Sequence, residues 1–406
     1  MSEREVKMGM NETPSSERVH IGFFGRRNAG KSSLVNAITN QEMSLVSEVK
    51  GTTTDPVYKT MELLPMGPVV IIDTPGFDDV GELGGQRIRK TRQVCNRVDA
   101  AVLVVDGTEG IQTEDREIEA VLKEKQIPYL IVYNKCDIYG TIEAKENVIA
   151  VSAKNKTGIE ALKKRIAVLT KTEESKHRIV GEFLNPGDFV VLVVPIDSAA
   201  PKGRLILPQQ QTIRDVIEAG ATAIVVREKE LRDTLQQLGK KPALVITDSQ
   251  AFEQVSADTP ADIPLTSFSI LMARYKGFLG EALKGVAAIE HLQDGDKILI
   301  AEGCTHHRQC EDIGTVKIPN WLKQYTGRQL EIETCSGREF PEDVSKYALI
   351  IHCGGCMLNE RELKYRMKCA VDVGVPFTNY GTTIAKIKGI LDRSIEILKK
   401  ESEQQG

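Results

Sequence analysis

Short apolar runs alternate with amphipathic stretches over the first part of the chain. Several runs are apolar throughout, which is typical of strands in a parallel sheet covered on both faces. Loop residues follow the carboxyl end of each run, and helical patterns fill the intervals. This alternation predicts a doubly wound α/β domain over residues 19–172. The strand-like runs lie at residues 20–25, 68–73, 100–106, 128–134 and 147–152.

A second, smaller α/β pattern follows the polar segment 170–178 and covers residues 178–270. Its three or four strand-like runs predict an incomplete sheet, and an open sheet edge needs covering. Pairing with a second copy of the chain would cover it, so we expect a homodimer. A rigid spacer between the outer domains is the alternative. The runs lie at residues 188–196, 221–226 and 242–248.

A third α/β pattern covers residues 271–400, with four strand-like runs separated by helices. Residues 1–18 are polar and charged, so we expect a disordered lead there rather than a signal peptide. The chain is therefore predicted to be an α/β protein of three consecutive domains. The runs of the third domain lie at residues 296–304, 328–335, 347–356 and 375–381.

Composition narrows the class of protein. The 406 residues are 41% hydrophobic and 27% charged, which is typical of a soluble globular protein. No apolar run approaches the roughly 18 residues that span a bilayer, so we expect no membrane association. A net charge of −4 gives no sign of general nucleic-acid binding. Eight cysteines without an export signal indicate reduced thiols and a cytoplasmic protein.

The first apolar run leads into the sequence GRRNAGKS, residues 25–32, which has the pattern of a phosphate-binding loop. Backbone N–H groups of such a loop face the phosphates, and the following helix adds its positive end. Lys31 is expected to reach the β- and γ-phosphates, and the Ser32 hydroxyl to complete the coordination of Mg²⁺. The other candidate nucleotide-binding residues of the loop are Gly25, Asn28, Ala29, Gly30 and Ser33.

Three further motifs end apolar runs. In DTPG, residues 73–76, Asp73 is expected near Mg²⁺ and the Gly76 amide near the γ-phosphate. In NKCD, residues 134–137, the Asp137 carboxylate can accept two hydrogen bonds from guanine, whereas adenine lacks those donors. In SAK, residues 152–154, a backbone amide would support the base. The candidate base-site residues are Asn134, Lys135, Asp137, Ser152, Ala153 and Lys154.

In this order the motifs resemble the GTPase signature, which implies guanine specificity. The sequence GTTTD at residues 51–55 resembles the first switch segment of the bacterial group that includes tRNA-modifying and ribosome-assembly GTPases. By that resemblance Thr53 closes on Mg²⁺ when the γ-phosphate is present. The expected catalytic set is Lys31, Thr53, Asp73 and Gly76.

Phe77 follows the DTPG motif, where Ras-like enzymes have the glutamine that orients the attacking water. Asn28 resembles the asparagine that helps bind a potassium ion in members of the bacterial group. We therefore expect slow intrinsic GTP hydrolysis that K⁺ stimulates. The alternative is that Arg26 and Arg27 act as cations in cis.

Cysteine and histidine gather where two strand-like runs of the third domain end, at Cys304 and His306 and at His352, Cys353 and Cys356. Doubly wound sheets build their ligand crevices at this edge. The two glycines between the last two cysteines allow their sulfurs to converge on one centre. Three cysteines are one thiolate short of the set that usually holds a four-iron cluster.

Other interpretations of these residues remain open. The same spacings suit structural zinc, a redox C-x-x-C pair, or buried cysteines beside surface histidines. His306, His307 and His352 compete for the fourth position, and the sequence does not choose among them.

A GTPase domain, a motif-free α/β domain and C-x-H followed by H-C-x-x-C together resemble one family, the HydF maturation GTPases of iron-iron (FeFe) hydrogenases. The resemblance covers nearly the whole chain from about residue 18. It implies a scaffold whose Cys304, Cys353 and Cys356 hold a 4Fe-4S cluster that His306 or His352 completes or tunes. It also implies a two-iron precursor, made with radical-SAM maturases and delivered to the apo FeFe-hydrogenase. The competing function is tRNA modification or ribosome assembly by a GTPase with a structural zinc.

Overall fold

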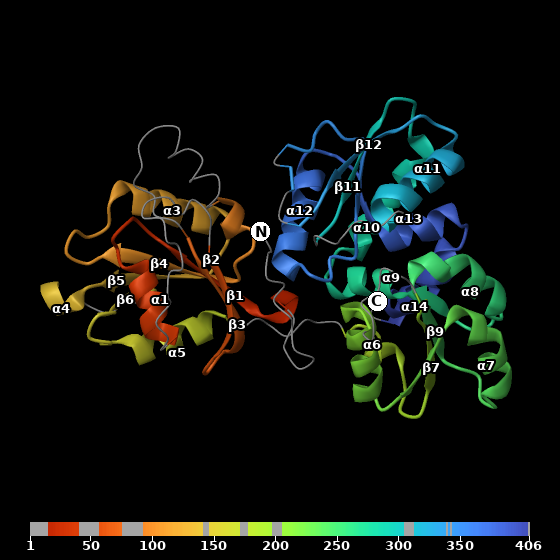
Figure 1. Ribbon diagram of the computed structural model, residues 1–406, viewed down its shortest axis with the longest axis horizontal. Coiled ribbons are helices and arrows are strands. Elements are labelled where there is room, and N and C mark those ends of the chain that lie inside the picture. Colours follow the sequence, from red (N-terminus) through yellow and green to blue (C-terminus); the bar gives the residue numbers. More distant parts are fainter. Residues whose placement is uncertain are drawn as a thin grey trace, which may run out of the picture. The chain divides into compact units, whose positions relative to one another are not determined.

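The computed structural model divides into two compact units, with the break after residue 173 (Figure 1). The structure describes residues 15–39, 57–74, 92–140, 146–170, 178–196, 205–303, 312–337, 340–341 and 343–404.

The first unit is built on a six-stranded sheet in the order β2-β3-β1-β4-β5-β6. All neighbouring strands are parallel except β2, which runs antiparallel to β3. The parallel strands form at the five apolar runs of the sequence. β2 was not predicted, because its residues, apart from the buried Leu63, are exposed or half-buried and lack a clear apolar run. The strands are β1 Val19–Phe24, β2 Val57–Leu63, β3 Gly67–Asp73, β4 Ala100–Asp106, β5 Tyr129–Asn134 and β6 Val148–Ala150.

Helices cover both faces of this sheet, which confirms the predicted doubly wound architecture. On one face, buried side chains of α1 and α5 pack against the strands, and on the other face those of α3 do so. The loops that follow β1, β3 and β5 therefore lie at one edge of the sheet, where parallel strands end. The helices are α1 Lys31–Thr39, α3 Thr113–Glu124, α4 Cys136–Tyr139 and α5 Ile159–Leu169, with the 3₁₀ turn η1 Ser15–Glu17 before β1.

The second unit contains two four-stranded sheets, and all neighbouring strands in both are parallel. The first has the order β10-β9-β7-β8 and the second β12-β11-β13-β14. The strands of the first are β7 Phe189–Val193, β8 Thr222–Val226, β9 Leu244–Thr247 and β10 Leu265–Ser267. Those of the second are β11 Lys297–Ala301, β12 Glu331–Cys335, β13 Leu349–His352 and β14 Phe377–Asn379.

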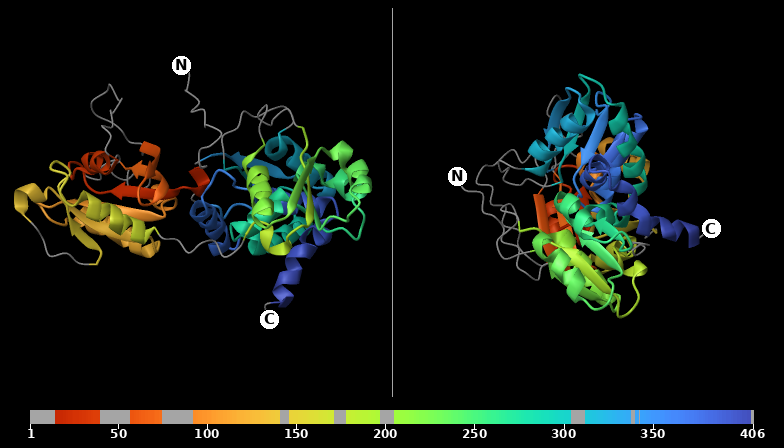
Figure 2. Two further views of the ribbon diagram at one scale, coloured as in Figure 1. Left: turned by 90° about the horizontal axis from the view of Figure 1, so that it is seen from below. Right: turned by 90° about the vertical axis from the view of Figure 1, so that its right-hand side faces the viewer.

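Helices surround both sheets of this unit (Figure 2). The unit also contains short 3₁₀ helices, which are η2 Gly181–Phe183, η3 Glu228–Glu230, η4 Ser249–Ala251 and η5 Ala287–His291, and one described π-helix, η6 Ile313–Lys317. The α-helices are α6 Leu207–Glu218, α7 Leu231–Gln237, α8 Phe252–Asp258, α9 Phe268–Tyr275, α10 Leu279–Val286, α11 Ile318–Thr326, α12 Glu360–Asp372, α13 Tyr380–Ile387 and α14 Leu391–Gln404.

Two helices join the sheets of the second unit. α9 is buried nearly all round: Phe268 and Leu271 pack into the core of the first sheet, while Ile270 and Ala273 pack into the core of the second. The carboxyl-terminal helix α14 returns to contact β10 of the first sheet. The two sheets are therefore fixed to each other, and α9 crosses the boundary predicted at residue 270.

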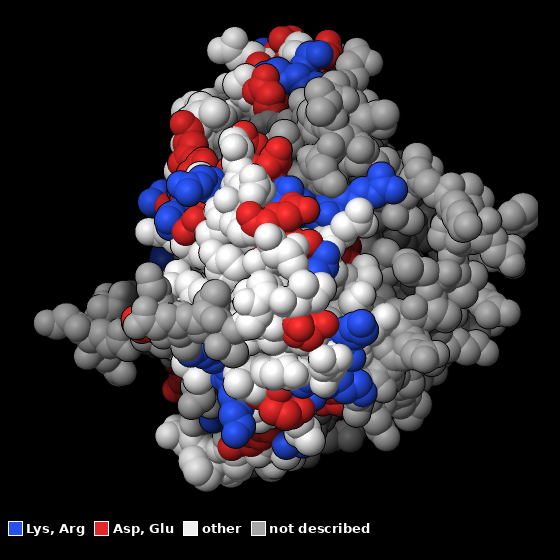
Figure 3. All heavy atoms as spheres, turned by 90° about the vertical axis from the view of Figure 1, so that its left-hand side faces the viewer, with Lys and Arg blue, Asp and Glu red and all other residues white. Residues whose placement is uncertain are grey.

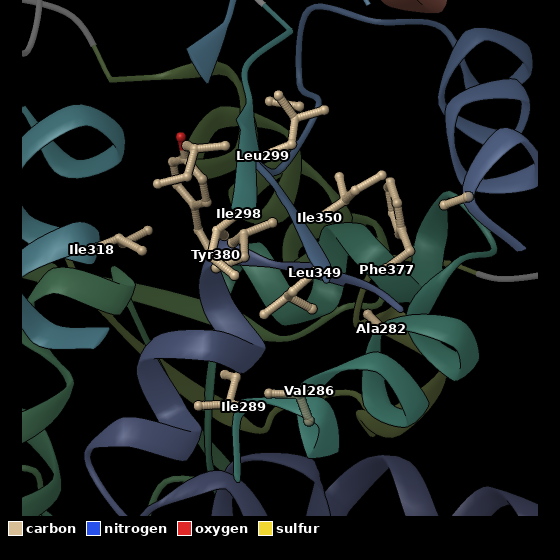
Figure 4. Close-up of a cluster of buried hydrophobic side chains, with 14 of the residues drawn as sticks. Ala282, Val286, Ile289, Ile298, Leu299, Ile318, Leu349, Ile350, Phe377 and Tyr380 are labelled. Carbon is tan, nitrogen blue, oxygen red and sulfur yellow. The ribbon is translucent and has the colours of Figure 1, made fainter. Parts of the chain in front are cut away.

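The larger core of the unit belongs to the second sheet (Figure 4). Ile298 and Leu299 of β11 and Leu349 and Ile350 of β13 are almost fully buried in it. Burial on both faces explains the uninterrupted apolar runs in these strands. The carboxyl ends of β11 and β13 lie side by side, with Ala301 opposite His352.

Candidate functional site

The loop between β1 and α1 has the backbone of a phosphate cradle. Gly25, Asn28 and Gly30 have positive φ angles of 139°, 61° and 89°. A Cβ on Gly25 would lie 2.2 Å from Val104 O, so this position requires glycine. Lys31 is buried, and its ammonium donates hydrogen bonds to Gly25 O (2.9 Å) and to a second loop carbonyl. The Lys31 side chain therefore lies back over the phosphate loop.

Ser32 and Asp73 meet across the sheet edge, as the Mg²⁺ prediction requires. Ser32 Oγ donates to Asp73 Oδ2 at 2.7 Å, while the buried Asp73 Oδ1 has no hydrogen-bond partner among the described residues. Burial raises the pKa of Asp73, and the Ser32 hydrogen bond and the Lys31 charge oppose that rise. A hydroxyl and an unsatisfied carboxylate oxygen are ligands that fit Mg²⁺. Together these two side chains can hold the cation.

The base-site motifs also converge. Asn134 donates through Nδ2 to Ala29 O (3.0 Å) and accepts at Oδ1 from Ala153 N (3.0 Å), which ties the phosphate loop to the SAK segment. Ser152 Oγ donates to Asp137 Oδ1 at 2.6 Å and orients that exposed carboxylate. Ser33 and Lys154 are exposed. The residues predicted from motifs far apart in sequence therefore form one site.

Asp106, at the end of β4, is a site residue that the motif search missed. Its carboxylate pairs with Lys135 and accepts hydrogen bonds from the Thr108 N–H and hydroxyl. Burial alone would raise the pKa of Asp106, but the bonds from Lys135 and Thr108 outweigh burial and lower it. The carboxylate thus holds Lys135 beside the base site. The sequence pattern that could have identified Asp106 is an aspartate at the end of an apolar strand.

Arg26 does not point freely toward the phosphate loop. Its guanidinium pairs with Glu109 (2.5 Å) and with the fully buried Asp115 (3.4 Å). In this arrangement both carboxylates compete with a nucleotide phosphate for the arginine. The predicted switch residues Thr53, Gly76 and Phe77 lie outside the described residues.

In the second unit, Cys353 begins the loop that follows β13. Its N–H donates to Ala301 O at 2.8 Å, which extends the ladder between β11 and β13. Its Sγ accepts hydrogen bonds from Gly303 N (3.1 Å) and Gly355 N (3.4 Å). Burial, and then the neighbouring Cys356, raise the pKa of Cys353 to about 11. Backbone N–H groups aimed at a sulfur suit a metal-bound thiolate, which carries the negative charge they stabilise.

His352 is fully buried and both its ring nitrogens have partners. Nδ1 lies 2.7 Å from Cys353 O, and Nε2 lies 3.3 Å from a guanidinium nitrogen of Arg366. A carbonyl can only accept, so Nδ1 carries the proton and Nε2 accepts from Arg366. Burial, and then the Arg366 charge, lower the pKa of His352 to about 3. The imidazole is therefore neutral and fixed in one tautomer.

The remaining predicted metal ligands, Cys304 and His306, lie outside the described residues, as do His307 and Cys310. Within the parts of the chain that are described, no three histidine, cysteine or acidic side chains gather closely enough to hold a metal ion. The six described cysteines are all free thiols. Gly303, whose N–H bonds the Cys353 sulfur, directly precedes Cys304.

Lysine and arginine alternate with aspartate and glutamate over the described atoms of one face of the GTPase-like unit (Figure 3). Each helix in the described ranges is too short or too polar to cross a lipid bilayer.

Three family models match the chain in succession. Residues 20–135 match the 50S ribosome-binding GTPase, residues 179–277 the hydrogen maturase F dimerization domain, and residues 280–397 the hydrogen maturase F tetramerization domain. The last segment is the domain in which the sequence predicts a metal centre. Its match to a tetramerization domain supports oligomer formation beyond the dimer expected from the sequence.

Individual relatives match the GTPase part. The tRNA modification GTPase MnmE of Laribacter hongkongensis is 36% identical over 156 residues, which are 36% of this chain and 34% of that protein. GTPase Der of Wolinella succinogenes is 32% identical over 202 residues, 46% of this chain and 42% of that protein. The chain thus spans less than half the length of these relatives.

Among solved structures, a probable GTP-binding protein engB is similar at 26% identity and a TM-score of 0.32. That match covers 38% of this chain and 99% of engB. The order of the three matched domains is the order of the three sheets in the structure. The chain therefore belongs to the hydrogen maturase F family, with a GTPase domain ahead of the family's dimerization and tetramerization domains.

Proposed function

We propose that the protein is a GTP-hydrolysing scaffold for assembly of the FeFe-hydrogenase active site. It carries a 4Fe-4S cluster on Cys304, Cys353 and Cys356, receives a two-iron precursor made with radical-SAM maturases, and delivers that precursor to the apo-hydrogenase. When bound, a four-iron cluster on three thiolates has one iron without a protein thiolate, where a second metal fragment can attach.

One observation carries this proposal: the bond from the Gly303 N–H to Cys353 Sγ. It brings the chain segment that leads into Cys304 against the sulfur of a cysteine 49 positions later in the sequence. The Gly355 N–H supports the same sulfur from the other side of the loop. Neither His352 nitrogen is free in this arrangement, so we assign His352 to positioning the loop and leave His306 as the histidine candidate for the cluster.

The GTPase domain supplies the switch in this proposal. Lys31, Ser32 and Asp73 would hold the phosphates and Mg²⁺, and Asp137 would select guanine. Thr53 and Gly76 would respond to the γ-phosphate. Because Phe77 cannot orient a water as glutamine does, hydrolysis is slow and times the association with partners.

The potassium part of the proposal has a direct test. Asn28 is exposed on the phosphate loop with its backbone in the left-handed region, where its side chain is available to a cation beside the nucleotide. We expect GTP turnover to be faster in KCl than in NaCl at equal ionic strength, and Asn28→Ala to remove most of that difference. Equal rates in the two salts would refute potassium stimulation.

The metal centre is tested by anaerobic reconstitution with iron and sulfide, followed by EPR of the reduced protein. A four-iron signal that is lost in Cys304→Ser, Cys353→Ser and Cys356→Ser supports the scaffold. Cys369→Ser, a half-buried cysteine of α12, is the matched control and should keep the signal. Stoichiometric zinc without a paramagnetic signal would instead favour the competing function, a tRNA-modification or ribosome-assembly GTPase with structural zinc. The similarity to the tRNA modification GTPase MnmE supports that alternative at the level of the GTPase domain.

Delivery is tested by mixing the reconstituted, precursor-loaded protein with apo FeFe-hydrogenase and measuring hydrogen evolution. The Cys353→Ser variant, prepared in the same way, serves as the inactive control. If the wild type and Cys353→Ser activated the hydrogenase equally, delivery would not depend on the cluster, and the scaffold role would be refuted.

A further inference from the structure

Lys276 is a buried lysine outside the cysteine motifs that contacts the cysteine loop. It follows the last residue of α9, and only 6% of it is exposed. Lysine is seldom buried unless its ammonium finds acceptors, because desolvating the charge is costly. Two acceptors are carbonyl oxygens of the loop after β13: Gly355 O and Leu358 O, the latter at 2.8 Å. They stand on either side of Cys356 in the sequence.

The loop conformation depends on these contacts. Gly355 has a φ of 62°, and its carbonyl also accepts from the Leu358 N–H at 3.0 Å. The Lys276 ammonium thus caps both ends of a tight turn that contains Cys356. A residue of α9 itself lies near the same loop: a Cβ built on Gly354 would be 3.8 Å from Ser269 Oγ. The loop is therefore close to the first turn of α9 and bonded to the residue that follows its last turn.

Lys276 and the loop belong to different matched domains. Lys276 lies within the dimerization segment 179–277, whereas the loop lies within the tetramerization segment 280–397. α9 is held by both cores, through Leu271 on one side and Ile270 on the other. Lys276 therefore directly follows a helix that is packed into both cores.

The charge of Lys276 matters as well as its hydrogen bonds. The ammonium also brings a positive charge to the turn that contains Cys356. A buried cation beside a thiolate-bound metal offsets the negative charge that the thiolates bring and that reduction of the metal increases.

We propose that Lys276 is a positioning residue for the metal-bearing loop, through which the dimerization domain fixes the geometry and the charge around Cys353 and Cys356. The proposal deepens the proposed function, since it takes this loop to hold the metal. It predicts two separable effects of removing the ammonium: a looser loop in the metal-free protein, and a more negative reduction potential in the iron-loaded protein.

The first test uses the full-length, metal-free protein. Lys276→Met keeps the length of the side chain and removes its donors and charge. Hydrogen exchange measured by mass spectrometry should become about tenfold faster at the amides of residues 354–359, the effect of losing roughly one net buried hydrogen bond. Lys284→Met, at an exposed lysine of α10, is the matched control and should leave these amides unchanged.

The second test is an EPR-monitored redox titration after reconstitution with iron and sulfide. The midpoint potential of Lys276→Met should be more negative than that of the wild type, because adding an electron is harder without the nearby positive charge. A variant that only loosened packing would not move the potential in this direction. Should Lys276→Met fail to fold, Lys276→Gln replaces it, since the amide keeps a donor without the charge.

Wild-type exchange rates together with a wild-type midpoint in the variant would overturn the proposal. If the wild type itself takes up no iron-sulfur cluster, the proposed function fails instead, and the exchange measurement still decides whether Lys276 holds the loop.

Discussion

Asp137 is the single residue of the GTPase domain that we propose selects the guanine base. It is exposed on α4, and the Ser152 hydroxyl fixes one of its oxygens at 2.6 Å. A carboxylate only accepts hydrogen bonds, so it complements the two N–H donors on guanine and rejects bases that present acceptors there. The Lys135 side chain beside it is held in turn by Asp106.

Replacing Asp137 by asparagine should change this preference. An amide donor facing a guanine donor loses charge-assisted hydrogen bonds of about 1.5–3 kcal/mol, so GTP affinity should fall about 10- to 100-fold. Xanthosine triphosphate, which has a carbonyl where guanine has an amino group, should bind better than it does to the wild type. Fluorescent nucleotide titration measures both affinities, with the exposed Asp233→Asn as control. An unchanged preference for GTP would remove Asp137 from the base site.

Arg366 is the most buried charged residue near the cysteine loop. Its guanidinium is fully buried on α12 and pairs with Glu362 at 3.0 Å, one helical turn earlier. It also donates to Gly337 O at 2.7 Å and reaches His352 Nε2. One side chain thus ties the loop after β12 to the end of β13.

Truncating Arg366 to methionine should therefore cost much more stability than a surface change. Removing one partner of a buried ion pair takes away the attraction that offsets the desolvation of the other charge, at a cost of about 3–5 kcal/mol. Urea unfolding followed by circular dichroism measures the loss. Lys368→Met on the exposed side of the same helix should stay within about 0.5 kcal/mol of the wild type.

The double variant Glu362→Gln, Arg366→Met tests the reason for that loss. Because glutamine carries no charge, the double variant should be more stable than Arg366→Met alone. A double variant that loses further stability would mean that packing around Arg366, rather than the loss of its attraction to the Glu362 charge, causes the effect.

At the scale of elements, the contact of α10 with β14 depends on one glycine. A Cβ on Gly285 would lie 2.2 Å from Phe377 O, a backbone atom that cannot move without displacing the strand. The same helix contains Gly280, where an added Cβ would meet nothing within 4 Å. The two glycines therefore offer a matched pair within one helix.

Gly285→Ala should destabilise the second unit, while Gly280→Ala should stabilise it slightly. The first change forces apart a packed helix and strand, with a cost of about 1–3 kcal/mol. The second replaces a flexible residue in a helix by a good helix former, with a gain of about 0.4–1 kcal/mol. Thermal unfolding of the two variants measures both signs. Equal effects at the two positions would refute the close approach of α10 to β14.

At the scale of the whole molecule, the edge strand β8 is the surface best suited to pairing two copies. It ends the first sheet of the second unit among the described strands, and Val225 on it is 46% exposed. The segment belongs to the dimerization domain of the family. An exposed, uncharged sheet edge is ready to pair with another strand.

Val225→Lys should therefore weaken the dimer, because a lysine on the edge opposes strand pairing. Light scattering coupled to size exclusion should show the molar mass of the assembly falling by half. Val371→Lys on α12 is a fair control, since that valine is also 46% exposed but lies on a helix. A dimer that survives Val225→Lys at micromolar concentration would place the interface elsewhere.

The sequence by itself determined the α/β class, five of the strands in the first sheet and the phosphate-loop and base motifs, because each of these is a local pattern. Apolar runs indicate strands that are buried on both faces of a sheet. The glycines of the phosphate loop indicate positions with positive φ angles, which a short motif is enough to identify. The half-exposed β2 escaped this reasoning, since its pairing with β3 leaves no local trace.

Only the tertiary structure decided which residues surround the cysteines. Glu362 and Arg366 have the spacing of an ordinary exposed helical pair, yet both are buried. Lys276 is 79 residues from the Gly355 carbonyl that it contacts. Burial of a charged side chain depends on what other segments place against it, and a linear sequence records charge and spacing but not those neighbours.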